Sequence, residues 1–85
     1  MEGSLKLTEL PRRVEALVEA VHEVAPNDTI ARRLRELGFV AGERVEVVAT
    51  GPFGSEPLLV QIGFTRFALR RSEAARILLR QVTSP

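Results

Sequence analysis

Cysteine, tryptophan and tyrosine are all absent from this 85-residue sequence, and its only aromatic side chains are four phenylalanines. Without cysteine the chain can form neither a disulfide framework nor a thiolate metal site, and it has no thiol redox chemistry. This composition fits the reducing cytoplasm, where we expect the protein to reside. Without tyrosine or tryptophan, the chain is also poorly equipped to line the aromatic groove with which small barrels grip proline-rich peptides.

Long apolar runs and a strong net charge are missing as well. No stretch approaches the ~20 apolar residues that a membrane-spanning helix needs. The first residues, Met1-Glu2-Gly3-Ser4, have neither the basic nor the apolar region of a signal peptide. The formal net charge of +1 is too small for a general attraction to nucleic acid or to a membrane surface. With 45% apolar and 27% charged residues, the composition predicts one ordinary folded domain.

Residues that could carry catalysis or hold a metal are scarce. His22 is the single histidine, and no serine or threonine belongs to a pattern with a histidine that could activate it. Glu19 and His22 have the Glu-x-x-His spacing of helical di-iron sites, but such sites need a second copy of the motif and two further glutamates. On a strand, the two side chains would point to opposite faces. We therefore assign no catalytic residue, no metal ligand and no cofactor, expect a surface position for His22, and expect that the protein is not an enzyme.

The most informative stretch begins with a predicted helix. Ile30, Leu34 and Leu37 recur at i, i+4 and i+7, which predicts one apolar stripe, while the intervening charged residues face outward. Asn27 or Asp28 can cap the start of this helix by accepting a free backbone N–H. The pattern predicts a helix that ends at Leu37.

A tight turn and a strand are predicted to follow the helix directly. Gly38 is expected to be the left-handed residue just past the helix end, so that Phe39 packs back on Leu34. Residues 40–43 suit a type II turn, in which Gly42 would take the position that needs positive φ. From residue 44 to 49, apolar and charged residues alternate, which predicts a half-buried strand.

The remaining segments are less clearly marked. Residues 14–21 fit a helical stripe and also fit strand alternation, and periodicity alone leans towards a helix. Residues 50–57 are predicted to form a loop from their glycine and proline content, with Gly51 and Gly54 as turn residues, and Gly63 is predicted to mark a turn or bulge. Strands are predicted over residues 58–62, 66–70 and 76–82, and one capped helical turn over 72–75. Several short strands with one helix suggest a small, partly open barrel.

This succession resembles the FeoA family of bacterial ferrous-iron uptake. The resemblance rests on a short helix ending in Leu-Gly-Phe, a turn ending in glycine, then Val-x-Val, and it continues through the second half with Gly51-Pro52-Phe53-Gly54, Pro57-Leu58, Gly63, Ala68-Leu69-Arg70 and Glu73-Ala74. It implies a mostly β, SH3-like barrel with one short helix, and a strand over residues 14–21. We expect a flexible N-terminus over residues 1–6, one domain over 7–82 and a tail over 83–85. The family turn usually has proline where Ala41 stands and commonly has glycine where Arg12 stands.

The resemblance implies a small cytosolic accessory protein that binds the cytoplasmic GTPase region of the membrane transporter FeoB. Two alternatives are a regulatory barrel like those of metal-dependent repressors and a small nucleic-acid-binding barrel, although few aromatics are available to stack on bases. A homo-oligomer is compatible with the sequence. The arginines fit either a solvated surface with ordinary ion pairs or a protein contact, and Phe53 is either a buried anchor or a contact residue. The candidate partner-binding residues are Arg32, Arg33, Glu36, Pro52, Phe53 and Arg70.

Overall fold

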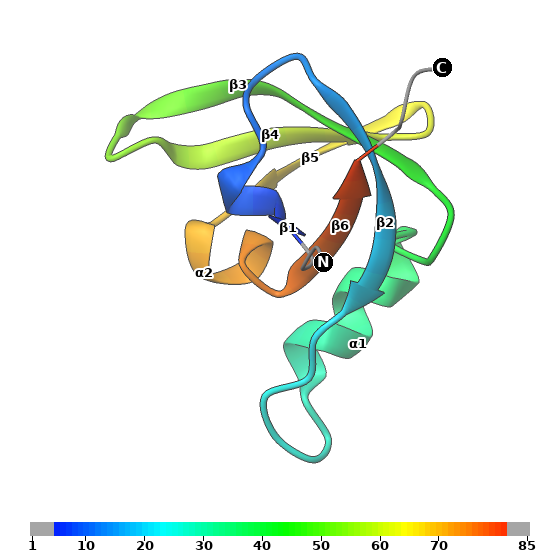
Figure 1. The fold of residues 1–85 in the computed structure, drawn as a ribbon. Helices are drawn as coiled ribbons and strands as arrows, with labels where there is room; N and C mark the ends of the chain where they lie inside the picture. Colours follow the sequence, from blue (N-terminus) through cyan, green and yellow to red (C-terminus); the bar gives the residue numbers. More distant parts are fainter. Residues whose placement is uncertain (1–4, 82–85) are drawn as a thin grey trace.

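The structure of the protein, a computed structural model, describes residues 5–81, in which six antiparallel strands curl into a partly open barrel (Figure 1). The strand order is β1-β6-β2-β3-β4-β5, so β1 and β5 are the outer strands. The elements are β1 (Leu5–Lys6), the 3-10 helix η1 (Leu7–Glu9), β2 (Glu15–Val21), α1 (Thr29–Leu37), β3 (Arg44–Phe53), β4 (Glu56–Ile62), β5 (Thr65–Leu69), α2 (Arg71–Ala74) and β6 (Ile77–Gln81). The predicted fold class, mostly β with one short helix and not closed, is confirmed.

Residues 14–21 illustrate how the barrel overrides local periodicity. They form β2, which pairs with β3 on one side and with β6 on the other. Ala16 and Val18 are fully buried, whereas Glu15 and Glu19 are exposed, as strand alternation requires. The strand implied by the family resemblance is therefore confirmed, and the helical periodicity is not realised.

Helix α1 begins and ends close to the predicted residues. Asp28 is the N-cap, and Asn27 precedes it in a left-handed conformation with φ of 58°. The apolar stripe differs from the prediction. Ala31 and Leu34 are buried, while Ile30 keeps 38% of its surface exposed. The stripe is displaced because Ala31 and Leu34, three residues apart, face the barrel and leave Ile30 at the edge of the helix.

The helix end and the following turn are as predicted. Gly38 has φ of 117°. Its N–H donates to the carbonyl of Arg35, and the N–H of Phe39 donates to the carbonyl of Leu34. These two hydrogen bonds define a Schellman cap. In the next turn Gly42 has φ of 94°, and the N–H of Glu43 donates to the carbonyl of Val40. These two turns lead the chain from α1 into β3.

The predicted loop over residues 50–57 is wrong. β3 continues to Phe53, β4 starts at Glu56, and only Gly54 and Ser55 turn between them, both with positive φ. A two-residue turn of this kind joins strands without a loop. Gly54 is a turn residue as predicted, but Gly51 is not. Gly51 and the two prolines fall in the irregular pairing between the Thr50–Leu58 and Phe53–Glu56 pairs. Prolines, which have no N–H to donate, are tolerated at such irregularities because the regular hydrogen-bond ladder is already interrupted there.

The second half of the chain follows the predicted order. Gly63 adopts φ of 58° in the turn from β4 to β5, as expected. The helical turn α2 starts one residue earlier than predicted and is capped by Arg70, whose N–H donates to the Glu73 carboxylate. At the other end of the chain, Leu5 and Lys6 form β1 against β6. The predicted tail over residues 83–85 lies outside the described residues.

The core lies between the curled sheet, α1 and η1. Phe39, directly after the helix cap, is fully buried and packs with its ring tilted towards that of Phe67 at 6.1 Å between centroids. Burying a side chain of this size contributes roughly 1.5–3 kcal/mol. The other members of the buried cluster are Leu7, Leu10, Ala16, Val18, Leu34, Val45, Val47, Leu58, Val60, Ile62, Leu69, Ala74, Ile77 and Leu79.

Candidate partner-binding surface

The outer face of α1 carries three of the candidate contact residues. Arg32, Arg33 and Glu36 are all exposed, because none of them lies on the buried stripe of Ala31 and Leu34. Within residues 5–81, neither Arg32 nor Arg33 forms an ion pair. Their charges are therefore available to an acidic partner.

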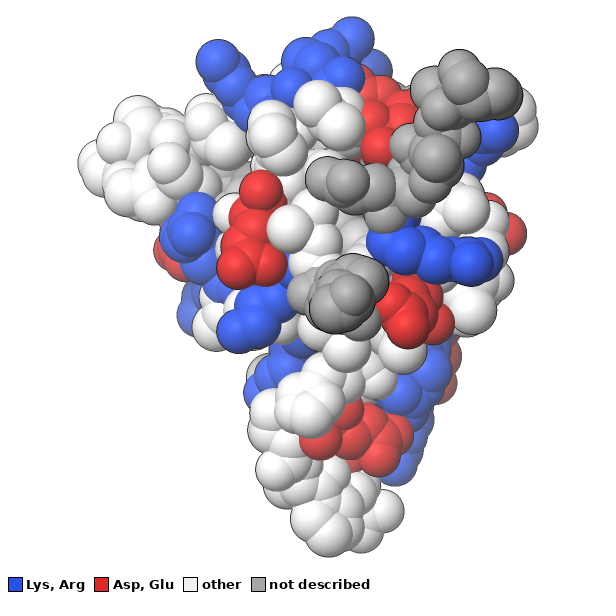
Figure 2. Space-filling view, viewed as in Figure 1, with Lys and Arg blue, Asp and Glu red and all other residues white. Residues whose placement is uncertain are grey.

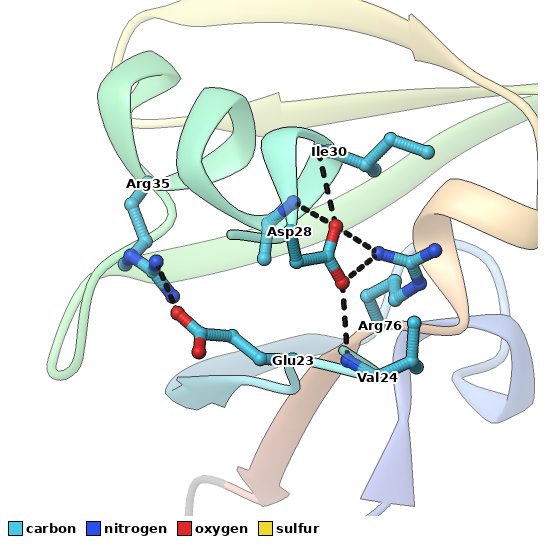
Figure 3. Close-up of polar contacts among 7 residues, drawn as sticks. Glu23, Val24, Asp28, Ile30, Arg35 and Arg76 are labelled. Atoms are coloured by element: carbon cyan, nitrogen blue, oxygen red, sulfur yellow. Dashed lines mark hydrogen bonds and ion pairs between the residues drawn. The ribbon is translucent and has the colours of Figure 1, made fainter. Parts of the chain in front are cut away.

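A carboxylate at the start of α1 fixes the helix to the barrel (Figure 3). The Asp28 side chain, 5% exposed, accepts hydrogen bonds from the N–H groups of Ile30 and Ala31, both at 3.1 Å, and from that of Val24 at 3.0 Å. It also forms a 2.6 Å ion pair with the guanidinium of Arg76, the residue before β6. The Val24 N–H, the Arg76 guanidinium and the Ala31 N–H together hold the pKa of Asp28 well below its usual range.

The arginines of α1 and those of the last part of the chain form two groups, and only some of their members are paired. The groups are Arg32, Arg33 and Arg35, and Arg66, Arg70, Arg71, Arg76 and Arg80. Arg35 on α1 forms a 2.6 Å ion pair with Glu23, and Arg76 is held by Asp28 (Figure 3). Figure 2 accordingly shows basic and acidic atoms interspersed over one face of the molecule, without a continuous area of one sign. The ordinary ion-pair interpretation thus holds for Arg35 and Arg76. The other arginines of these groups are exposed and form no ion pair with a described residue, and they are Arg32, Arg33, Arg66, Arg70, Arg71 and Arg80.

The tip of the β3–β4 hairpin is an uncharged projection. Phe53 is 81% exposed there, and Pro52 and Gly54 beside it are exposed as well. In Figure 2 this tip is the white lobe at the left. Phe53 does not fold back onto the barrel, so the buried-anchor interpretation of this residue is wrong. An exposed aromatic side chain on a projecting turn is suited to contact with a partner.

Arg70 lies between the hairpin and the helix α1. It follows β5 directly, and the next residue, Arg71, donates its N–H to the Glu56 carboxylate at 2.8 Å. Glu56 in turn lies opposite Phe53 in the hairpin. The start of α2 is therefore held near the base of the hairpin tip. Glu73 of α2 and Arg33 of α1 both line the groove described next.

A groove between α1 and β5 was missed by sequence reasoning. We call it the α1–β5 groove, and it is lined by Ile30, Arg33, Leu34, Leu37, Phe67, Ala68, Leu69 and Glu73. Only the tertiary fold brings these two elements together, and no sequence signal indicated it. Phe64, fully exposed in the β4–β5 turn, was also missed, although its place after Gly63 between two alternating segments was a usable signal.

His22 lies on the surface directly after β2, as expected. Its backbone N–H donates to the carbonyl of Arg76. Within residues 5–81, no three His, Asp or Glu side chains gather in a way that could hold a metal ion. In the same range, no helix is long and apolar enough to cross a membrane.

A sequence model of the FeoA domain matches residues 5–81, and so spans all the described elements. This chain belongs to the FeoA family. Among solved structures, the zinc complex of Stenotrophomonas maltophilia FeoA is 62% identical, covers 89% of both chains and superposes with a TM-score of 0.83. That protein is described as a prokaryotic SH3 domain protein and a candidate activating factor of bacterial ferrous iron transport.

Two further solved structures are similar to this chain. FeoA of Chlorobium tepidum is 30% identical, with a TM-score of 0.79 over 93% of this chain and 71% of its own. A FeoA-like protein of Clostridium acetobutylicum is 22% identical and has a TM-score of 0.81 over 100% and 94% of the two chains, which supports the fold alone. No protein with curated annotation matches the sequence. The SH3-like fold is thus confirmed for this FeoA protein.

The departures from the family pattern do not disturb the FeoA fold. Ala41 stands where the family usually has proline, yet the turn closes with its hydrogen bond and the positive φ of Gly42. Arg12 lies exposed in the turn between η1 and β2. The candidate contact residues fall into two groups. Arg32, Arg33 and Glu36 lie on α1, and Pro52, Phe53 and Arg70 lie at or near the β3–β4 hairpin.

Proposed function

We propose that this FeoA protein is a cytoplasmic accessory factor of bacterial ferrous iron uptake that binds the cytoplasmic GTPase region of FeoB. The proposal is supported by family membership and by a close relative described as a candidate ferrous iron transport activating factor. The single observation that carries it is the exposure of Phe53 on an uncharged hairpin tip. Arg70 and Arg71, which form no ion pair with a described residue, lie near the base of that hairpin, where the Arg71 N–H donates to the Glu56 carboxylate. The protein acts by binding, and it has no catalytic role of its own.

Aromatic residues and arginines are the side chains that most often dominate binding energy at protein interfaces. On this surface Phe53 would supply apolar contact area, while Arg33 and Arg70 would set the orientation of an acidic partner. Glu36 and Pro52 would lie at the periphery of the contact, together with Arg32.

Calorimetric titration into the isolated GTPase domain of the transporter tests the proposal. We expect saturable binding that weakens with added salt, because exposed charges separated by more than ~8–10 Å are screened near 0.1–0.15 M salt. Arg33→Glu should weaken the complex most at low salt. Arg12→Glu changes an arginine that is also exposed but lies in the turn between η1 and β2, outside the candidate partner-binding residues, and it is the matched control. The proposal is contradicted if no saturable binding is observed, or if Arg33→Glu and Arg12→Glu weaken binding equally.

A further inference from the structure

β5 leaves part of its backbone unpaired. It is an outer strand, and within the described sheet it pairs with β4 alone. Ile62 and Thr65 flank a two-residue turn, and such flanking pairs exchange hydrogen bonds, after which bonded and non-bonded pairs alternate. The N–H and C=O groups of Arg66 and Ala68 therefore point away from β4. No hydrogen bond from any residue between 5 and 81 reaches these groups.

The α1–β5 groove adjoins this free edge. Leu34 and Leu69 are buried in its floor, Leu37 and Phe67 are half-buried, and Ile30 forms an exposed rim on α1. A strand added beside β5 would direct every second side chain towards this apolar floor. A groove between an edge strand and a helix is thus shaped for an extended peptide whose alternate residues are apolar.

The charges around the groove favour a peptide with acidic side chains. Arg33 lines it, and Arg66 and Arg70 flank the free edge of β5, without an ion pair to any described residue. The Arg66 guanidinium donates only to the neutral side chain of Gln61. Glu73 is the single acidic lining residue, and its carboxylate accepts the Arg70 N–H. Acidic side chains on the outward face of a bound strand would meet these arginines.

We propose that the α1–β5 groove binds an extended acidic segment of a partner protein, which adds to β5 as a further strand. Main-chain hydrogen bonds to Arg66 and Ala68 supply affinity, and the apolar floor together with the arginines supplies selectivity. The inference rests on the proposed function, since it states how the Arg33 and Arg70 part of the same surface recognises a partner.

The probe is an acetylated and amidated octapeptide of alternating glutamate and valine, titrated into the ¹⁵N-labelled protein and followed by NMR. Amide shifts should be confined to β5 and α1. Ala68→Pro removes the outward N–H at an exposed position without removing a bond to β4, and it should weaken binding about tenfold or more. Ala68→Thr keeps the N–H and should bind within about twofold of the unchanged protein.

A charge variant covers the case in which Ala68→Pro does not fold. Arg66→Glu should weaken peptide binding about fivefold or more at low salt, whereas Arg12→Glu should leave it unchanged. The inference is overturned if about 1 mM peptide causes no shifts, if the shifts map to the hairpin tip, or if Ala68→Pro binds as tightly as Ala68→Thr.

The same variants separate this inference from the proposed function. If Ala68→Pro binds the GTPase domain as tightly as the unchanged protein does, and the peptide does not bind, the groove is rejected as a binding site and the transporter remains the proposed partner. If the peptide binds and is weakened by Ala68→Pro and Arg66→Glu as expected, but the GTPase domain does not bind, the groove is supported as a binding site and the transporter is rejected as the partner.

Discussion

Gly38 sets the point at which α1 ends and the chain turns towards β3. Its φ of 117° is in the region that side chains with a Cβ rarely adopt, and the cap hydrogen bonds to Leu34 and Arg35 depend on it. Apart from Gly38 itself, its two chain neighbours and the adjacent helix backbone, no atom lies within 4 Å of a Cβ placed on this glycine. A side chain here would therefore cost backbone strain alone, without any overlap with neighbouring atoms.

Gly38→Ala should accordingly destabilise the protein by about 1 kcal/mol or more, through the left-handed penalty on the backbone. Gly38→Asn should cost less, because asparagine tolerates this conformation. Urea denaturation of the three proteins measures both differences. Equal free energies of unfolding for all three would mean that the cap does not determine where the helix ends.

The depressed pKa of Asp28 predicts how stability depends on pH. A carboxylate whose pKa is lower when folded stabilises the protein above its unfolded pKa of about 3.9, and this stabilisation is lost as the pH falls towards the folded value. Asp28→Asn should therefore melt at a lower temperature than the unchanged protein at pH 7. This difference in melting temperature should become smaller below pH ~4. A difference that stays constant from pH 7 to pH 2 would contradict the role assigned to the charge.

At the scale of elements, the β3–β4 hairpin depends on close approach of its two strands. A Cβ on Gly51 would overlap the backbone carbonyl of Glu56, whereas a side chain at Gly54 would meet open space. Gly51→Ala should cost ~1–3 kcal/mol through overpacking. Gly54→Asn, which keeps positive φ accessible, should be close to neutral. Thermal melting that ranks the two substitutions in the reverse order would mean that the hairpin adjusts elsewhere.

The same elements show what a sequence can predict. The helix caps at Asp28 and Gly38 are local chemistry, so residue types a few positions apart were sufficient. β2 was ambiguous because its apolar residues fit two periods, and only pairing with β3 and β6 decides between them. The hairpin over 50–57 was missed because its glycine and prolines occupy irregular pairing within strands rather than a loop.

At the scale of the whole molecule, the candidate surface was only partly predictable. Exposure of Arg33 follows from the helix pattern, whereas the sequence left Phe53 open between a buried anchor and a contact residue. The α1–β5 groove does not follow from local patterns, because Ile30 and Phe67 meet through the tertiary fold of segments that are far apart in the sequence. Pairing of Arg76 with Asp28 across the barrel was likewise beyond reach of local patterns.

The monomer should hold no tight Fe²⁺ or Zn²⁺ site, because one histidine and no cysteine cannot build a closed metal shell. The relative from Stenotrophomonas maltophilia is described as a zinc complex, so calorimetry with both ions is the relevant measurement. We expect only weak binding that His22→Ala leaves unchanged. Stoichiometric binding at micromolar affinity or tighter, lost in His22→Ala, would contradict this prediction.

The central claim is that the exposed hairpin tip serves a partner and not the core. Phe53→Ala should cost far less stability than the ~3–5 kcal/mol of a truncated core phenylalanine. It should still weaken binding to the transporter's GTPase domain by about 1 kcal/mol or more, roughly fivefold in Kd. Phe64→Ala removes an exposed ring from the β4–β5 turn, at the end of β4 away from the hairpin tip, and is the matched control.

The most direct measurement is therefore the affinity of the Phe53→Ala protein for that domain, with its melting temperature recorded in parallel. The account predicts a near-unchanged melting temperature, weakened binding by Phe53→Ala and full binding by Phe64→Ala. Full-strength binding by Phe53→Ala, or a loss of stability as large as that of a core truncation, would contradict it.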